Sequence, residues 1–274
     1  MYWSLPRNQA HLGSICYFAI LNLTPDSFSD GGLFLDPAKA VNRGKELLAQ
    51  GARVIDIGAE STRPGSQPVA PQEEWARIAP VLSGLRLEHP DCMLSIDTRR
   101  AEVASLALNA GADIINDVTG FQDPEMLELA SNSNCGIVAM RIRMMDGQIW
   151  MPDYLDQTPK NVYSAIQELK IVKDRLLNAG IEPERILLDP GFGFGTTLLE
   201  DQAMWNAMPG LPAKLNWPVE RFCIGISRKR FVAHTFGVSG NTLLDAKTAE
   251  LHKHAAGIGY KVFRTHSLPG SIRR

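Results

Sequence analysis

The chain has 274 residues, of which 45% are hydrophobic and 21% are charged, and its formal net charge is -2 at pH 7. A chain of this length and composition can bury a sizeable core. The mixture of charges without a basic block argues against a nucleic-acid or membrane partner. No apolar run approaches the length of a membrane span.

The N-terminal segment and the cysteines bear on the compartment. Met1–Ser14 is polar, is broken by Pro6 and lacks the apolar region of a signal peptide. The cysteines form no C-x-x-C pair, and each lies at or near the start of an apolar run; they are Cys16, Cys92, Cys135 and Cys223. Buried free thiols in a reducing cytosol are favoured over a zinc site or disulfides. We therefore expect a cytoplasmic protein.

Apolar runs of strand length recur along the chain, and helical periodicity follows them. In chain order, the predicted strand–helix pairs are Cys16–Leu23 with Pro37–Ala49, Arg53–Ile57 with Gln72–Leu87, Met93–Ile96 with Ala101–Asn109, Asp113–Val118 with Pro124–Ser131, Gly136–Ile142 with Pro159–Asn178, and Arg185–Leu188 with Leu198–Ala207. The strand Arg221–Ile226 precedes helical segments between Lys229 and Ala256, and Lys261–Phe263 is the last strand. Asp36 before Pro37 is typical of a helix start.

Eight strands alternating with helices predict a single (β/α)8 TIM barrel over residues 1–274. The competing open, doubly wound sheet normally has fewer strands, and the glycine-rich G-x-G-x-x-G turn is absent after the first strand. Only eight residues follow His266, so the last helix is expected to be truncated. The N-terminal segment or a partner chain would fill the groove that this helix normally covers, or the groove is left weakened.

Barrel enzymes carry their chemistry at the C-terminal ends of the strands. The polar residues at those positions are Asn22, Asp56, Asp97, Asn116, Arg141, Asp189, Ser227, Arg228, Lys229, Arg264 and His266. Taken singly, Asp97 and Asn116 could serve the start of the next helix, and Asp189 could serve a turn. Taken together, two carboxylates and an amide suit a heteroaromatic ring with several N–H donors and acceptors.

Cations and two long loops lie at the same predicted mouth. The run Ser227–Arg230 is either a solvated basic turn or an anion or polar-ring site at a helix start. Arg264 and His266 can converge and, with Arg63, form a phosphate clamp. The residues of the 20–32 loop alone suggest a metal or phosphate site built from Asp26 and Asp30. The loop Glu60–Gly65 adds a second candidate lid.

Seven motifs, in order, resemble the dihydropteroate synthase family of pterin-binding barrels. They are Asn-Leu-Thr-Pro-Asp-Ser-Phe-Ser-Asp-Gly-Gly, Glu-Ser-Thr-Arg-Pro-Gly, Ser-Ile-Asp-Thr, Ile-Ile-Asn-Asp, Leu-Asp-Pro-Gly-Phe-Gly-Phe, Gly-Ile-Ser-Arg-Lys and Arg-Thr-His, between Leu21 and His266. The resemblance implies the magnesium-assisted condensation of 6-hydroxymethyl-7,8-dihydropterin pyrophosphate with 4-aminobenzoate, which gives 7,8-dihydropteroate and pyrophosphate. It also implies a homodimer.

The resemblance carries the family's roles onto this chain. The pterin-binding set would be Asp97, Asn116, Asp189, Lys229 and Met140, with Asp97, Lys229 and Asn22 as the catalytic residues. The pyrophosphate set would be Thr62, Arg63, Arg264, Thr265 and His266. The 4-aminobenzoate set would be Ser227, Phe194, Phe28 and Pro64. Asn22 would contact the Mg²⁺ ion, which replaces the first interpretation of Asp26 and Asp30 as metal ligands.

Two departures from the family pattern stand out. Arg141 follows Met140, where the family usually has His. The last helix, which in the family supports the barrel and lies near the dimer interface, has no room here. A non-catalytic pterin-binding paralogue is therefore one alternative. A methyltransferase domain that binds methyltetrahydrofolate is another, although it would not need the cations Arg63, Arg264 and His266.

Overall fold

The computed structural model describes residues 2–7, 9–11, 13–24, 36–61, 68–145, 148–158 and 162–269. Its main sheet consists of parallel strands in the order β10-β7-β6-β5-β4-β3-β12-β11. The strands are β3 (Cys16–Asn22), β4 (Val54–Gly58), β5 (Met93–Asp97), β6 (Ile114–Asp117), β7 (Gly136–Met140), β10 (Ile186–Asp189), β11 (Cys223–Ile224) and β12 (Val262–Thr265). A parallel bridge between Leu188 and Phe222 joins the two ends of this sheet. The predicted (β/α)8 barrel is confirmed.

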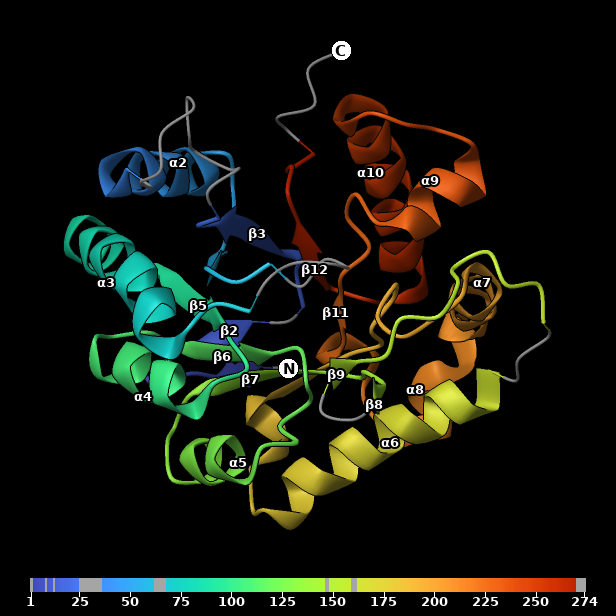
Figure 1. Ribbon diagram of the computed structural model, residues 1–274, viewed down its shortest axis with the longest axis horizontal. Coiled ribbons are helices and arrows are strands. Elements are labelled where there is room, and N and C mark those ends of the chain that lie inside the picture. The colour runs from blue at the N-terminus through green and yellow to red at the C-terminus, as the bar shows by residue number, and fades with distance from the viewer. Residues whose placement is uncertain are drawn as a thin grey trace.

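Helices surround the sheet (Figure 1). They are α2 (Pro37–Ala49), α3 (Pro71–Glu88), α4 (Ala101–Asn109), α5 (Pro124–Ser131), α6 (Val162–Asn178), α7 (Leu198–Ala207), α8 (Leu211–Leu215), α9 (Arg230–Phe236) and α10 (Asn241–Ile258). The Asp36 side chain accepts the Ala38 backbone N–H at 2.9 Å, which confirms the expected N-cap of α2. Up to residue 269, no helix follows β12 in the described part of the chain.

Alternate residues of each barrel strand face opposite sides, and the two sides have different neighbours. Outward residues such as Ile55, Ile57 and Ile96 join the apolar layer beneath α2 and α3. Inward residues at the N-terminal ends of the strands form a second apolar cluster together with Trp3 and Leu5 of the N-terminal segment. The strand residues are Cys16, Phe18, Val54, Met93, Ile114, Val138, Leu187, Cys223 and Val262. We call this cluster the floor of the barrel.

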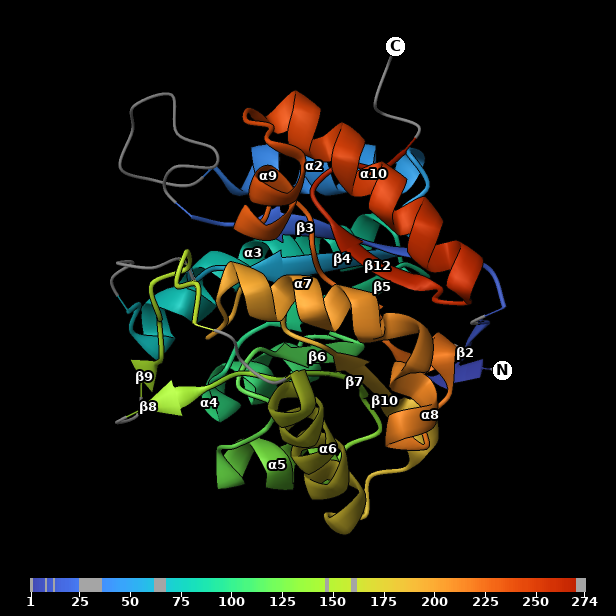
Figure 2. The same cartoon turned by 90° about the vertical axis from the view of Figure 1, so that its right-hand side faces the viewer.

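The floor is completed by a hairpin that the sequence did not predict. The strands β1 (Tyr2–Ser4) and β2 (Gln9–His11) pair antiparallel at the end of the barrel away from the second unpredicted hairpin, β8 (Met144–Met145) and β9 (Gln148–Ile149) (Figure 2). Trp3 is fully buried, and its indole N–H donates to the Arg185 carbonyl at 2.7 Å. A Cβ on Gly136 would lie 2.9 Å from the Trp3 ring, so a larger residue there would displace it. The N-terminal segment thus closes the barrel floor.

The groove beside β12, which a last helix would cover, is partly filled by the residues that follow this strand. Leu268 is 1% exposed and packs into the apolar layer beneath α2 and α3. The segment after β12 therefore covers part of the outer surface of the strands. The cysteines are free thiols, as expected, but Cys92 is only half-buried while the other three are buried. Burial raises the pKa of Cys16 to about 12. Within the described residues, no helix is long and apolar enough to cross a membrane.

Candidate active site

Four polar side chains from different strands meet inside the barrel above the floor. Arg264 from β12 donates from Nε to Asp56 Oδ2 at 2.6 Å and from a terminal nitrogen to Asp97 Oδ2 at 2.5 Å. The Asn116 side-chain amide donates to the same Asp56 oxygen at 3.1 Å. Asp56 therefore links Arg264 to Asn116. The sequence placed Asp56 at the mouth but assigned it no role, because only the closed barrel brings β4, β6 and β12 around one carboxylate.

The burial of this cluster changes its protonation. Burial raises the pKa of Asp97 to about 7, although the Arg264 guanidinium opposes that rise. Burial by itself would lower the pKa of Arg264, but the carboxylates of Asp56 and Asp97 more than offset this and raise it. Asp56 is fully buried, and its second oxygen, Oδ1, has no hydrogen-bond partner within the described residues.

A second group of polar residues lies across the mouth at the end of β10. The Asp189 carboxylate accepts the Gly191 backbone N–H at 2.8 Å, and burial raises its pKa. Lys229 Nζ donates to the Phe192 carbonyl at 2.7 Å and lies 4.5 Å from the centre of the Phe194 ring. Burial lowers the pKa of Lys229 to about 8, while Asp189 opposes that change. A lysine of this kind is still mostly charged at pH 7.

The backbone after β11 leaves room for these two side chains. A Cβ on Gly225 would lie 3.0 Å from Asp189 Oδ2 and 3.7 Å from Lys229 Nζ. The residue at 225 therefore has to be small if the carboxylate and the ammonium are to keep these positions. Met140 and Phe194 belong to one small apolar cluster beside them, with Val118 and Ile142. Apolar side chains thus adjoin the polar ones, an arrangement that suits a heteroaromatic ring.

The residues predicted for the phosphates and for the second ring are partly brought together. Ser227 Oγ lies 3.1 Å from His266 Nδ1, accepts the His266 backbone N–H at 3.1 Å, and lies 3.4 Å from the Thr265 hydroxyl. Arg228, by contrast, points to α10, where it forms a two-armed ion pair with Asp245 at 2.7 Å. The predicted Phe28, Thr62, Arg63 and Pro64 lie outside the described residues, as do Asp26 and Asp30.

Asp117 explains why its neighbour Asn116 faces the mouth. The Asp117 carboxylate accepts the backbone N–H groups of Thr119 and Phe121, each at 2.7 Å. It therefore braces the loop after β6, whereas the start of the next helix, the alternative role considered for Asn116, is capped by Asp123. Asn116, on the opposite face of the strand, is left to contact Asp56 and the mouth.

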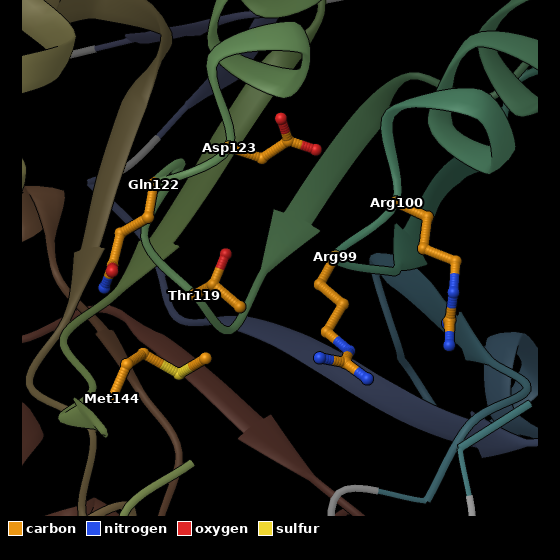
Figure 3. A pocket seen from close by; sticks show the side chains of 6 residues that line it. All are labelled: Arg99, Arg100, Thr119, Gln122, Asp123 and Met144. Atoms are coloured by element: carbon orange, nitrogen blue, oxygen red, sulfur yellow. The ribbon is translucent and has the colours of Figure 1, made fainter. Parts of the chain in front are cut away.

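An ion cluster that the sequence did not predict lies on the rim of the mouth. Arg100 binds Glu60 at 2.7 Å and the fully buried Glu74 at 2.5 Å, and Arg99 binds Glu60 at 3.2 Å. A cavity of about 390 Å³ lies beside it and is lined by Arg99, Arg100, Thr119, Gln122, Asp123 and Met144 (Figure 3). The cluster ties the segment after β4 to α3 and to the start of α4, so it braces this rim.

The donor set at the mouth fits a magnesium ion that takes most of its ligands from a phosphate. The described residues contain no group of three or more His, Cys, Asp or Glu side chains arranged to hold a metal. Asn22, the last residue of β3, offers one neutral amide oxygen at the strand end. Magnesium is commonly bound by one or two protein oxygens together with substrate phosphates and water. A single amide therefore suits an ion that arrives with a pyrophosphate.

A barrel with a buried set of acids, an amide and a lysine at its mouth defines the class of pterin-binding barrels. The family model described as pterin binding enzyme matches residues 18–266. Dihydropteroate synthase of Streptococcus pyogenes serotype M6 is 36% identical over 263 residues, which cover 93% of this chain and 91% of the relative. The enzyme of Neisseria meningitidis serogroup C is 36% identical over 270 residues, covering 97% and 92%. The chain belongs to the dihydropteroate synthase family.

Solved structures agree in fold. Xanthomonas albilineans dihydropteroate synthase with 4-aminobenzoic acid has a TM-score of 0.85 and 32% identity, and the match covers 99% of this chain and 95% of that one. The Thermus thermophilus enzyme in complex with 6HMPPP has a TM-score of 0.79 and 31% identity, and the match covers 99% and 96%. The family assignment from seven short motifs is confirmed.

Proposed function

We propose that this chain condenses 6-hydroxymethyl-7,8-dihydropterin pyrophosphate with 4-aminobenzoate, releasing pyrophosphate and forming 7,8-dihydropteroate for folate biosynthesis. The observation that supports it most is the convergence of Asp97, Asn116, Asp189 and Lys229 at one buried mouth. The family relatives and the solved structures with 4-aminobenzoic acid and 6HMPPP support the same reaction.

The pterin would be bound by its edge and its face. The Asp189 carboxylate would accept from a ring N–H and the amino group, the Asn116 amide would pair with a ring nitrogen, and Met140 would cover one face. Lys229 would donate to the pterin carbonyl or a ring nitrogen after leaving the Phe192 carbonyl. Because these groups are buried, each hydrogen bond to the ring also relieves a desolvated polar atom, which favours a pterin over an apolar ring.

The reaction breaks the C–O bond between the pterin methylene and the pyrophosphate. The methylene carbon becomes electron-deficient, and its charge is shared with the pterin ring. The Asp97 carboxylate would stabilise that charge, and Arg264, Thr265 and His266, together with Thr62 and Arg63, would hold the departing anion. The neutral arylamine nitrogen of 4-aminobenzoate then bonds to the carbon and loses a proton to solvent, so no nucleophilic side chain is needed.

Magnesium, the second substrate and the assembly complete the proposal. A Mg²⁺ ion held by Asn22 would neutralise charge on the pyrophosphate. Ser227 and Phe194, with Phe28 and Pro64, would bind 4-aminobenzoate. We further propose that the protein is a cytoplasmic homodimer, in keeping with the family resemblance.

The test is pyrophosphate release by the purified chain with both substrates and magnesium. Lys229→Ala and Asp97→Asn are the variants expected to be inactive. Lys247→Ala, at a half-buried position on α10 where Lys247 pairs with Glu250, is the matched control. Wild type and Lys247→Ala should give equal rates, with product confirmed by mass. No product above the two disabled variants would reject the proposal. Pterin pyrophosphate bound in calorimetry but never converted would instead identify a non-catalytic paralogue.

A further inference from the structure

The loop between β10 and α7 carries its backbone in an unusual shape. Gly191, Gly193 and Gly195 have φ angles of +72°, +74° and +64°, a left-handed conformation that favours glycine. A Cβ on Gly191 would lie 2.0 Å from the Arg141 carbonyl oxygen, so the loop presses closely against the segment after β7. Repeated left-handed residues leave several loop carbonyls outside any helix or strand, and those carbonyls need donors.

Arg141 supplies two of these donors from a buried position. Its side chain is 2% exposed, its Nε donates to the Pro190 carbonyl at 2.9 Å, and one terminal nitrogen donates to the Gly191 carbonyl at 3.0 Å. The other terminal nitrogen binds Glu168 of α6 at 2.9 Å. A planar guanidinium can bind three acceptors in this way, whereas an imidazole or an ammonium cannot match the same geometry.

Arg143 extends the contact along the loop. It binds the second oxygen of Glu168 at 2.7 Å, binds Glu200 at 2.6 Å, and donates to the Gly195 carbonyl at 3.3 Å. Glu200 in turn accepts the Thr197 backbone N–H at 2.9 Å as part of the capping box of α7. Two arginines and two glutamates thus hold both ends of the loop. We call Arg141, Arg143, Glu168 and Glu200 the brace.

The braced loop is also the support of two candidate pterin contacts. Asp189 immediately precedes it and accepts the Gly191 N–H, and Lys229 donates to the Phe192 carbonyl. Arg141 binds the carbonyl of Gly191 itself and that of Pro190. A change in the backbone at 190–192 would therefore move the partners of both Asp189 and Lys229.

We propose that Arg141, joined to Arg143 through Glu168, is a positioning residue that holds the 190–197 loop in the shape that presents Asp189 and Lys229 to the pterin. This inference rests on the proposed function for its substrate. It gives a role to the arginine that departs from the family's usual histidine. The brace contacts the loop backbone and not the pterin ring. Its loss should therefore weaken pterin binding, because the loop would no longer hold Asp189 and Lys229 in place.

Arg141→Lys tests the brace by keeping the charge and removing the fork of donors. We expect about a 10- to 100-fold rise in the KM for pterin pyrophosphate, since a small misplacement of binding groups is costly. The KM for 4-aminobenzoate should change less. The high-pH limb of kcat/KM, which reports Lys229, should move as that lysine loses its fixed partner. Lys170→Met, at an exposed position of α6 that pairs with Asp174, should match wild type in every readout.

Glu168→Gln provides a second variant in case Arg141→Lys does not fold. Its side chain is partly exposed, so folding should survive, and the KM for the pterin substrate should rise about three- to tenfold. In a double variant, the rise in KM, expressed as a free energy, should be smaller than the sum of the two single effects, because both residues act through one network. A folded Arg141→Lys or Glu168→Gln protein with a pterin KM within twofold of wild type would overturn the inference.

Hydrogen exchange separates this inference from the proposed function. Peptides that cover residues 189–197 should exchange at least about tenfold faster in Arg141→Lys than in wild type or Lys170→Met, whether or not the protein turns over substrate. If wild type neither binds pterin nor releases pyrophosphate, the proposed function fails, and unchanged exchange in the variants would then reject the brace as well.

Discussion

The two ends of the barrel differ although the same strands build them. At the floor, inward residues such as Val54, Leu187 and Val262 pack around Trp3. Two residues further along the same strands, the inward positions are Asp56, Asp189 and Arg264. One pleat repeat therefore separates a packed apolar layer from a charged one. The floor therefore supports stability and the mouth holds the candidate active site, so substitutions at the two ends should have separable effects.

The largest expected effect is on the floor. Trp3→Ala removes a fully buried indole and its hydrogen bond to the Arg185 carbonyl, and should lower the free energy of unfolding by about 3–5 kcal/mol. Urea unfolding measures this change. Leu87→Ala, at an exposed position of α3, should change stability by less than about 0.5 kcal/mol. The remaining folded Trp3→Ala protein should keep its kcat/KM, and a loss there would break the separation of the two ends.

At the mouth, the expected effect is on activity. Lys229→Ala should lower kcat/KM by about 100- to 1000-fold, because a half-buried charged donor to the substrate is lost. Its urea midpoint should stay near that of wild type, since the ammonium of this half-buried residue no longer has to be desolvated but its attraction to Asp189 is lost as well. Steady-state pyrophosphate release and unfolding curves on the same sample measure both quantities. A large loss of stability with normal activity would reverse the assignment of this end.

A third layer, between the strands and the helices, contains a buried histidine. His252 is 3% exposed, packs 4.6 Å from the Phe263 ring, and has its pKa lowered to about 3 by burial. Below pH 6.5 the unfolded chain binds a proton at this site and the folded protein does not. Folding stability is therefore lost at about 1.4 kcal/mol per pH unit as pH falls from 6.5 towards 3.

His252→Phe keeps the aromatic contact and removes this titration. Between pH 6.5 and 5, wild type should lose about 2 kcal/mol more stability than the variant. Parallel urea curves at the two pH values give the difference. The same loss in both proteins would mean that His252 titrates normally in the folded state.

The smallest expected effect is the pH dependence of the mouth itself. Asp97, with a pKa of about 7, is mostly ionised above pH 7, and Lys229, with a pKa of about 8, is mostly charged below pH 8. The profile of kcat/KM should rise through pH 7 and fall above pH 8, by up to about tenfold per pH unit. Lys229→Arg should lose the high-pH limb, because a guanidinium stays charged. A flat profile from pH 6 to 9 would show that activity requires neither the carboxylate form of Asp97 nor the charged form of Lys229.

Much of the fold followed from hydrophobic periodicity, and Asp36 before Pro37 marked the start of the first predicted helix. The predicted ranges Pro37–Ala49, Ala101–Asn109, Pro124–Ser131 and Leu198–Ala207 coincide with α2, α4, α5 and α7. The strand expected at Arg221–Ile226 is shorter, and the two hairpins were missed. The Tyr2–His11 hairpin has too few residues to show a pattern, and its burial depends on the floor that Trp3 fills. Short segments of this kind are decided by what they pack against.

By itself, the sequence determined the barrel, its strand ends and the family, since each depends on local periodicity or on motifs that are contiguous in the chain. Only the tertiary structure decided which partners these residues take. Asp56 lies between Arg264 and Asn116, and Arg141 lies against a loop about 50 residues away in sequence. Such pairs arise when distant strands close into one ring, and their energies depend on burial. Neither their distances nor the resulting pKa values of Asp97 and Lys229 can be obtained from local sequence.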